Sequence, residues 1–314
     1  MQAIYLSSYG EAPELRDAPD PPAPGPSQLL VRVRAASVNP VDWKQASGKI
    51  WYYMAAKFPF VPGFDLAGEV VASGPGCEAF PVATRVHTRL HGKKGGAYGT
   101  LAIAGLNVAN PMPAGMSFEQ AAAIPLAGMT ALQGLHNIAG LPMEGAKARV
   151  LVVGASGGVG HLAVQIAVAM GAHTTGVCSG RNVAFVRGLG AHEVVDYTQP
   201  NPYANRAPYD VVMDCVGSDP AAFTPLLTPK GTFASCMPGA AVIGWSALNF
   251  ARQRSVKPVM LRSSAADLGT LDRLFEAGKL APAIDSTFSL ADTAKAWDRS
   301  QSGRAVGKIV ISMP

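Results

Sequence analysis

The stretch VLVVGASGGVGHLAVQIA, residues 150–167, decides the fold of this chain. It opens with an apolar run typical of a buried strand and closes with apolar residues at helical spacing. A strand that turns straight into a helix needs small residues at the turn, and a bound pyrophosphate needs the same close access to the backbone. The N–H groups of the helix N-terminus would face that pyrophosphate. The stretch predicts a dinucleotide-binding loop, with Ala155, Gly157 and Gly160 at the small-residue positions and Ser156, Gly158 and Val159 between them.

The sequence around this loop alternates apolar strands with helical stretches. We expect strands at residues 148–154, 173–179, 193–197, 209–217 and 231–237, with helices at 161–171 and 182–190. This rhythm is typical of a doubly wound parallel sheet, the Rossmann arrangement. Such sheets bind ligands at the carboxyl ends of their strands, which is where Val216 and Gly217 fall.

The first third of the chain has a different character. Short strands such as 28–38 and 65–74 alternate with Gly and Pro turns, and they indicate a β-rich unit. A helix is expected after Ser117, because Gln120 lies three residues later and completes a capping box. A helix at 267–278 and a strand at 307–311 close the chain. The fold class is therefore α/β with two domains.

The turn after the second strand of the parallel sheet indicates which dinucleotide is bound. An Asp or Glu in this turn would bind the ribose hydroxyls of NAD, and residues 178–182 contain neither. Ser179 and Arg181 would instead bond a 2′-phosphate, which predicts NADPH. An ordinary solvated arginine remains the alternative for Arg181.

Composition excludes several classes of protein. No apolar run reaches the roughly 18 residues that span a bilayer, and the first residues do not resemble a secretory signal. The four cysteines are scattered without a CxxC pair, which favours a cytoplasmic protein. A net charge of +5 raises nucleic acid as a partner, but no long basic run supports it. We therefore expect neither a nucleic-acid nor a membrane partner.

Several sequence blocks, in order along nearly the whole chain, resemble one known family. They include AASVNPVDWK (35–44), VPGFDLAGEVV (61–71), IPLAGMTALQGL (124–135) and GRAVGKIVI (303–311). The chain resembles the medium-chain dehydrogenase/reductase superfamily, in its zinc-free quinone oxidoreductase (zeta-crystallin-like) and alkenal/enone reductase branch. The resemblance implies a GroES-like catalytic domain of residues 1–124 and 265–314. It also implies a Rossmann domain of residues 125–264, with the cofactor between the two.

The resemblance implies site residues as well. Asn39, Asp42 and Lys44 would line the catalytic side, and Tyr52 or Tyr53 would donate a proton or stack on a planar substrate. Surface lysine and partly buried tyrosine remain the plain alternatives for Lys44 and Tyr52. Further cofactor contacts are implied for Thr130, Tyr197 and Arg304.

The superfamily's alcohol dehydrogenases bind catalytic zinc through a cysteine and a His-Glu pair. Here Asn39 and Phe64-Asp65 stand at those positions, and they lack the thiolate and imidazole that zinc needs, so no metal is expected. Two smaller departures are Ala83 in place of the usual glycine and Asn182 in place of a frequent lysine.

The leading hypothesis is hydride transfer from NADPH to a quinone or an α,β-unsaturated carbonyl. A 2-enoyl-thioester reductase and a non-catalytic NADPH-binding or interaction protein are the alternatives. The family commonly dimerises, so we expect a homodimer in which the apolar residues 240–245 contribute to the edge of the parallel sheet.

Overall fold

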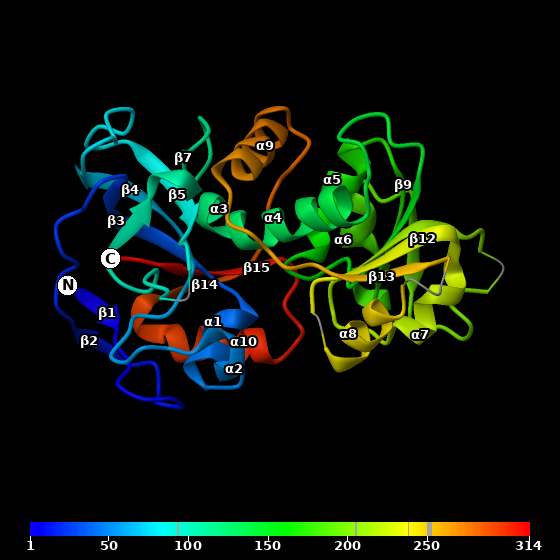
Figure 1. The fold of residues 1–314 in the computed structure, drawn as a ribbon, viewed down its shortest axis with the longest axis horizontal. Helices are drawn as coiled ribbons and strands as arrows, with labels where there is room; N and C mark the ends of the chain where they lie inside the picture. Colours follow the sequence, from blue (N-terminus) through cyan, green and yellow to red (C-terminus); the bar gives the residue numbers. More distant parts are fainter. Residues whose placement is uncertain (93, 205, 238, 250–252) are drawn as a thin grey trace. The chain divides into compact units, whose positions relative to one another are not determined.

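The computed structural model describes residues 1–92, 94–204, 206–237, 239–249 and 253–314. The chain forms two units, and each contains segments that are distant in the sequence. Unit 1 consists of Met1–Leu126, Ser263–Glu276 and Pro282–Pro314, and unit 2 of Ala127–Arg262 and Ala277–Ala281. In Figure 1 the red C-terminal strand lies in the same unit as the blue N-terminal strands.

The described part of unit 1 contains a seven-stranded sheet with the last strand of the chain inside it. Strand β3 alternates exposed and buried residues over its first half, as its sequence predicts. It pairs antiparallel with β4, β6 and β15, so the C-terminal strand lies beside an N-terminal one. The order is β14 (Ile284–Ser289), β15 (Lys308–Ser312), β3 (Gln28–Val38), β4 (Asp65–Ser73), β5 (Arg85–Arg89) and β7 (Ala109–Pro111), with β6 (Leu101–Gly105) on β3.

The described part of unit 1 also contains a two-stranded sheet, five α-helices and short 3-10 helices at Leu106–Val108 and Leu290–Asp292. The capping box predicted at the start of α3 is confirmed, since Gln120 N donates to Ser117 Oγ over 3.2 Å and Ser117 N donates to Gln120 Oε1 over 3.0 Å. These strands and α-helices are β1 (Gln2–Ile4), β2 (Leu15–Asp17), α1 (Pro40–Ala46), α2 (Trp51–Met54), α3 (Phe118–Ala123), α9 (Ala265–Glu276) and α10 (Thr293–Gln301).

Two local features of unit 1 explain sequence details. Ala83, at the family's usual glycine, has a φ of +72°, the left-handed region in which a Cβ is unfavourable. Helix α9 is held to the sheet by polar side chains. Asn110 Nδ2 donates to Asp272 Oδ2 over 3.0 Å, and the other carboxylate oxygen lies 2.9 Å from His87 Nε2.

The described residues of unit 2 contain a six-stranded parallel sheet in doubly wound order, which confirms the predicted fold class. The chain starts at a central strand, moves to one edge, returns and then moves to the other edge. The strand order is β10 (Glu193–Asp196), β9 (His173–Cys178), β8 (Arg149–Val153), β11 (Tyr209–Asp214), β12 (Leu227–Ser235) and β13 (Ser255–Pro258).

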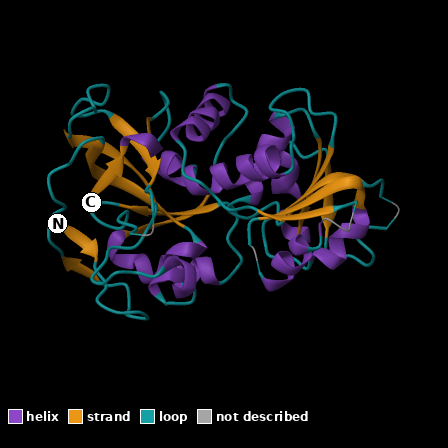
Figure 2. Ribbon diagram, in the orientation of Figure 1, coloured by secondary structure: helices purple, strands orange, loops and turns teal. Residues whose placement is uncertain are grey.

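Helices cover both faces of this sheet (Figure 2). Residues 240–245 lie in helix α8, which packs against the edge strand β13. Helix α4 (Pro125–Leu132) continues as a π-helix (Gln133–Ile138). Along the described stretches of the chain, no helix has both the length and the apolar character to cross a membrane. The remaining helices are α5 (Gly160–Ala169), α6 (Val183–Gly188), α7 (Pro220–Phe223) and α8 (Ala240–Ala247).

Candidate functional site

The glycine loop of unit 2 leaves no room for side chains at its two ends. A Cβ built on Gly160, the first residue of α5, would lie 2.0 Å from the carbonyl oxygen of Gly154. Gly154 has a φ of +77°, and a Cβ there would lie 2.4 Å from Cγ1 of Val216. The loop needs glycine at these positions because the start of the helix lies against the backbone of Gly154, and the Val216 side chain packs directly on Gly154.

The same loop presents backbone donors at the start of α5. Gly157 N donates to Gly154 O, and His161 N donates to Gly157 O. The amides of Gly158, Val159 and Gly160 donate no bond to a described residue, as expected for the first turn of a helix. A bare-backbone cradle with unsatisfied N–H groups fits a pyrophosphate.

Substitution of Gly160 by alanine tests this close packing. Because the new Cβ would meet backbone rather than a flexible side chain, we expect Gly160→Ala to lower the free energy of unfolding by about 2 kcal/mol or more. Gly157→Ala is the matched control, since its Cβ would lie 3.4 Å from the nearest atom. Urea denaturation measures both, and equal losses would show that the Gly160 contact is relaxed in solution.

The turn after β9 lies beside the glycine loop. Asn182 Nδ2 donates to Ser156 Oγ over 3.0 Å, so the residue that replaces the family's lysine ties the turn to the loop. Arg181 is exposed, and no ion pair joins it to a described residue. Ser179 is half-buried at the start of the same turn. Arg181 is therefore placed on a turn where its guanidinium is available to an anion.

One carboxylate near this turn was missed by the sequence analysis. Asp196 ends β10, and a Cβ built on Gly180 would lie 2.7 Å from its Oδ2. Hydrogen bonds from Thr198 lower the pKa of Asp196, and Gln199 donates a further bond. The Asp196 carboxylate is therefore hydrogen-bonded within its own turn. The next residue, Tyr197, is 57% exposed.

The end of β11 is fixed by a buried aspartate that sequence reasoning also missed. The Asp214 carboxylate accepts hydrogen bonds from the amides of Val216, Gly217 and Ser218, and from Ser235 Oγ. The signal available in the sequence was an aspartate at the end of an apolar strand, three residues before a glycine. Asp214 thus holds Val216 against Gly154 and shapes this part of the glycine-loop surroundings.

In unit 1 the predicted residue Asn39 lies inside a buried polar network. Its Nδ2 donates to Asp65 Oδ2 over 2.9 Å, and its Oδ1 accepts from Lys308 Nζ over 2.6 Å. Asp65 also accepts from Ser37 Oγ and from the amide of Leu126. Burial raises the pKa of Asp65 and lowers that of Lys308. Both ends of the Asn39 amide are hydrogen-bonded, so in this structure Asn39 holds Asp65 and Lys308 in position.

Asp42 extends the network. Its Oδ2 accepts from Asn39 N over 2.7 Å and from the hydroxyl of Tyr98 over 2.8 Å. Asp42 is fully buried, and burial raises its pKa to about 7 despite these hydrogen bonds. Lys308 and Tyr98 were not predicted, and the sequence offers no local signal for either.

The remaining predicted residues are placed separately. Lys44 is half-buried, with its Nζ 5.4 Å from the ring centroid of Trp43. Tyr52 is 71% exposed on α2, whereas burial raises the pKa of its neighbour Tyr53. In unit 2 Thr130 is buried in α4, and in unit 1 Arg304 is exposed between α10 and β15.

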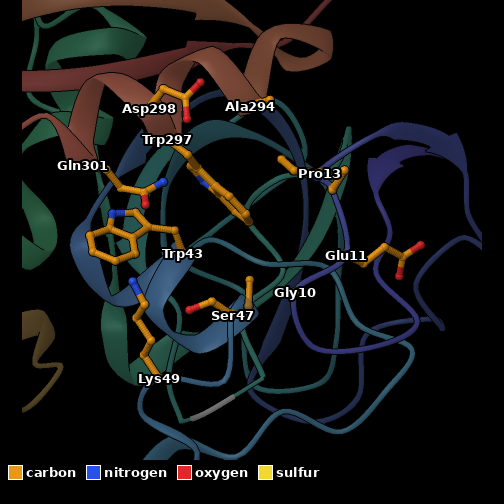
Figure 3. A pocket seen from close by; sticks show the side chains of 12 residues that line it. Gly10, Glu11, Pro13, Trp43, Ser47, Lys49, Ala294, Trp297, Asp298 and Gln301 are labelled. Atoms are coloured by element: carbon orange, nitrogen blue, oxygen red, sulfur yellow. The ribbon is translucent and has the colours of Figure 1, made fainter.

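A cavity of about 220 Å³ also lies in unit 1, between α1, α10 and the loop at residues 10–13. Figure 3 shows the indoles of Trp43 and Trp297 in its wall. The ring of Trp297 lies 6.4 Å from that of Tyr98, the hydroxyl donor to Asp42. None of the predicted site residues lines this cavity.

The buried Asp42 carboxyl makes stability depend on pH. Its pKa is higher in the folded chain than its ordinary 3.8, so the folded state binds this proton more tightly. The stabilisation is complete below pH 4 and is lost as the pH rises toward 7. Asp42→Asn keeps an oxygen that accepts both hydrogen bonds and removes the titration.

We therefore expect the free energy of unfolding of the wild type to fall relative to Asp42→Asn between pH 5 and 8. The expected difference is on the order of 2 kcal/mol, measured by urea denaturation at each pH. Parallel curves for the two proteins would contradict the raised pKa.

A GroES-like sheet with a Rossmann unit and a glycine loop defines a class of dehydrogenases and reductases. Residues 25–133 match the family described as alcohol dehydrogenase GroES-like domain, and residues 189–311 match that described as zinc-binding dehydrogenase. The chloroplast envelope quinone oxidoreductase homolog of Arabidopsis thaliana is 37% identical over 322 residues, covering 99% of this chain and 98% of that protein.

Two further comparisons agree. The trans-enoyl reductase pgmF of Aspergillus terreus is 33% identical, covering 92% of this chain and 87% of that protein. The structure of the quinone oxidoreductase from Coxiella burnetii has a TM-score of 0.89 and 28% identity, covering 100% of this chain and 99% of that one. This chain belongs to the medium-chain dehydrogenase/reductase superfamily of oxidoreductases, in its quinone oxidoreductase branch.

Proposed function

We propose that this oxidoreductase transfers hydride from NADPH to a quinone or an α,β-unsaturated carbonyl without a catalytic metal. The observation that carries the proposal is the Asn39–Asp65–Lys308 network. By the resemblance, two of its members, Asn39 and Asp65, stand where related alcohol dehydrogenases have zinc-binding residues. An amide already bonded at both ends and a carboxylate with several donors are a poor match to the thiolate and imidazole that zinc prefers. The similarity to quinone oxidoreductase homologues over nearly the whole chain supports the acceptor class.

The glycine loop would hold the pyrophosphate of the cofactor, and Arg181 with Ser179 its 2′-phosphate. Thr130, Tyr197, Val216, Gly217 and Arg304 are the further cofactor contacts that we propose. NADPH supplies a hydride when bound. We also propose that the cofactor lies between a catalytic domain of residues 1–124 and 265–314 and a cofactor domain of residues 125–264.

The chain's own catalytic work is then modest. A conjugated acceptor is already electrophilic, so the enzyme must orient it, exclude water and stabilise charge on its carbonyl oxygen. Lys44 and Tyr52 carry the donors that we assign to that oxygen. Asn39 and Asp42 are assigned as positioning residues, because their side chains are buried and bonded inside unit 1.

An NADPH-oxidation assay tests the proposal. We expect NADPH to be oxidised on addition of a quinone or an enone, with the rate unchanged by a metal chelator. Lys44→Met is expected to lower kcat/KM by about 10- to 100-fold through the lost donor. Turnover confined to alcohols with added zinc would contradict the proposal.

The preference for NADPH depends on Arg181. We expect Arg181→Gln to raise the KM for NADPH by about tenfold, because a charge-assisted bond to the 2′-phosphate is lost, while the KM for NADH stays unchanged. Arg187→Gln, an exposed arginine in the last turn of α6, is the matched control. An equal rise for both cofactors would place Arg181 outside the 2′-phosphate site.

A 2-enoyl-thioester reductase is the second candidate. The 33% identity to a protein named trans-enoyl reductase favours it. Enoyl thioesters in the same assay distinguish the two, since reduction of thioesters in preference to quinones selects the second candidate. Tight NADPH binding with no acceptor reduced would instead favour the non-catalytic alternative. A homodimer and a cytoplasmic location remain predictions, and sizing at several concentrations tests the first.

A further inference from the structure

Two of the scattered cysteines meet at the end of the parallel sheet. Strands β11 and β12 pair in register up to Asp214 and Ser235, whose side chains share a hydrogen bond of 2.6 Å on one face. Cys215 and Cys236 are the next residues of the two strands. Because side chains alternate along a strand, these cysteines lie together on the opposite face.

The backbone still pairs at this level, since Cys236 N donates to Asp214 O over 3.0 Å. Neighbouring strands lie about 4.7–4.9 Å apart, within the roughly 4.4–6.8 Å that joins the Cα atoms of a disulfide.

The two thiols interact directly. A hydrogen bond with Cys236 raises the pKa of the Cys215 thiol well above its ordinary value, and burial adds to the effect. Cys215 therefore keeps its proton and donates it toward the Cys236 sulfur. Both residues are half-buried, whereas Cys77 and Cys178 are buried. Cys215 and Cys236 thus differ from the other two cysteines in being partly exposed to solvent and in having a second thiol as hydrogen-bond partner.

We infer that Cys215 and Cys236 form a reversible dithiol–disulfide modification site that responds to peroxides. The Cys236 thiol gives up its proton, its sulfur attacks a peroxide oxygen, and the O–O bond breaks. A sulfenic acid forms, and the departing hydroxide takes up that proton and leaves as water. The Cys215 sulfur then attacks the sulfenic sulfur, the S–S bond forms, and the proton and hydroxyl leave as a second water. Two thiols lose two electrons and one hydrogen peroxide gains them.

The bond would act on the glycine loop. Cys215 is joined to Val216, whose Cγ1 packs against Gly154. Cys236 is joined to Met237, and a Cβ built on Gly217 would lie 3.2 Å from that of Met237. Drawing the two strand ends together therefore moves Val216 and Gly217 relative to the glycine loop. A weaker affinity for NADPH follows, and this consequence rests on the proposed function.

The test uses the full chain, reduced and then treated with hydrogen peroxide. We expect loss of two of its four free thiols, a Cys215–Cys236 linked peptide in mass spectrometry, and recovery of both thiols with dithiothreitol. Cys215→Ser and Cys236→Ser should each abolish the linked peptide. Cys77→Ser is the matched control that should retain it, since a serine hydroxyl can keep the bond that the Cys77 thiol donates to Gln28 O.

The affinity for NADPH, followed by fluorescence titration, is expected to fall about tenfold on oxidation and to recover on reduction. A linked peptide with an unchanged Kd would overturn the effect on the glycine loop. Oxidation that stops at single sulfinic acids, without a linked peptide, would overturn the site itself. Failure of the reduced protein to bind NADPH would count against the proposed function, whereas the linked peptide judges the disulfide independently.

Discussion

The burial of charge where β3, β4 and β15 come together is the constraint on which unit 1 depends. Asp65 and Lys308 are both removed from water, and each would be costly alone. Asn39 joins them by donating to one and accepting from the other. Removal of one partner from such a buried set typically costs about 3–5 kcal/mol, so the three residues hold the strands in one arrangement. Asn39 also precedes α1, so this network fixes the start of the helix that carries Asp42 and Lys44.

The polar groups of the two units differ in whether they have hydrogen-bond partners. In unit 1 the Asn39 amide is bonded at both ends to buried charged partners, which fixes its geometry. In unit 2 the start of α5 keeps backbone donors that have no acceptor among the described residues, and the absence of side chains at Gly154 and Gly160 gives access to them. The network of unit 1 therefore fixes the positions of its side chains, whereas the backbone donors of unit 2 are available to an anion.

The features that could be predicted from the sequence are those specified by residues close together in the chain. The capping box at Ser117, strand β3 and the turn from β8 to α5 are each specified by residues within a few positions of one another. The doubly wound order follows as well, because parallel strands need crossover helices and the rhythm shows them. Lys308 escaped prediction since its partner Asn39 lies 269 residues away.

Burial was the other quantity that the sequence did not reveal. Asp42 stands in the first turn of a helix, and the sequence does not show that the carboxyl is fully buried; this burial raises its pKa, although the hydrogen bond from Tyr98 acts in the opposite direction. Likewise Cys215 and Cys236 are neighbours through the register of two strands and not through any motif. In both cases the chemistry arises from which strand lies beside which.

The position of β15 has a consequence for synthesis. This strand lies between β14 and β3, yet it is built from the last residues of the sequence, whereas most of unit 2 is one continuous stretch. On the ribosome the first 126 residues emerge early but lack two strands of their sheet until residues 282–314 follow. Unit 2 is then the first to complete its core, contrary to the usual N-terminal-first order. Until then the C-terminal part of β3, Ala35–Val38, lacks its partner strand β15. An unpaired strand edge is the kind of surface that chaperones protect from other chains.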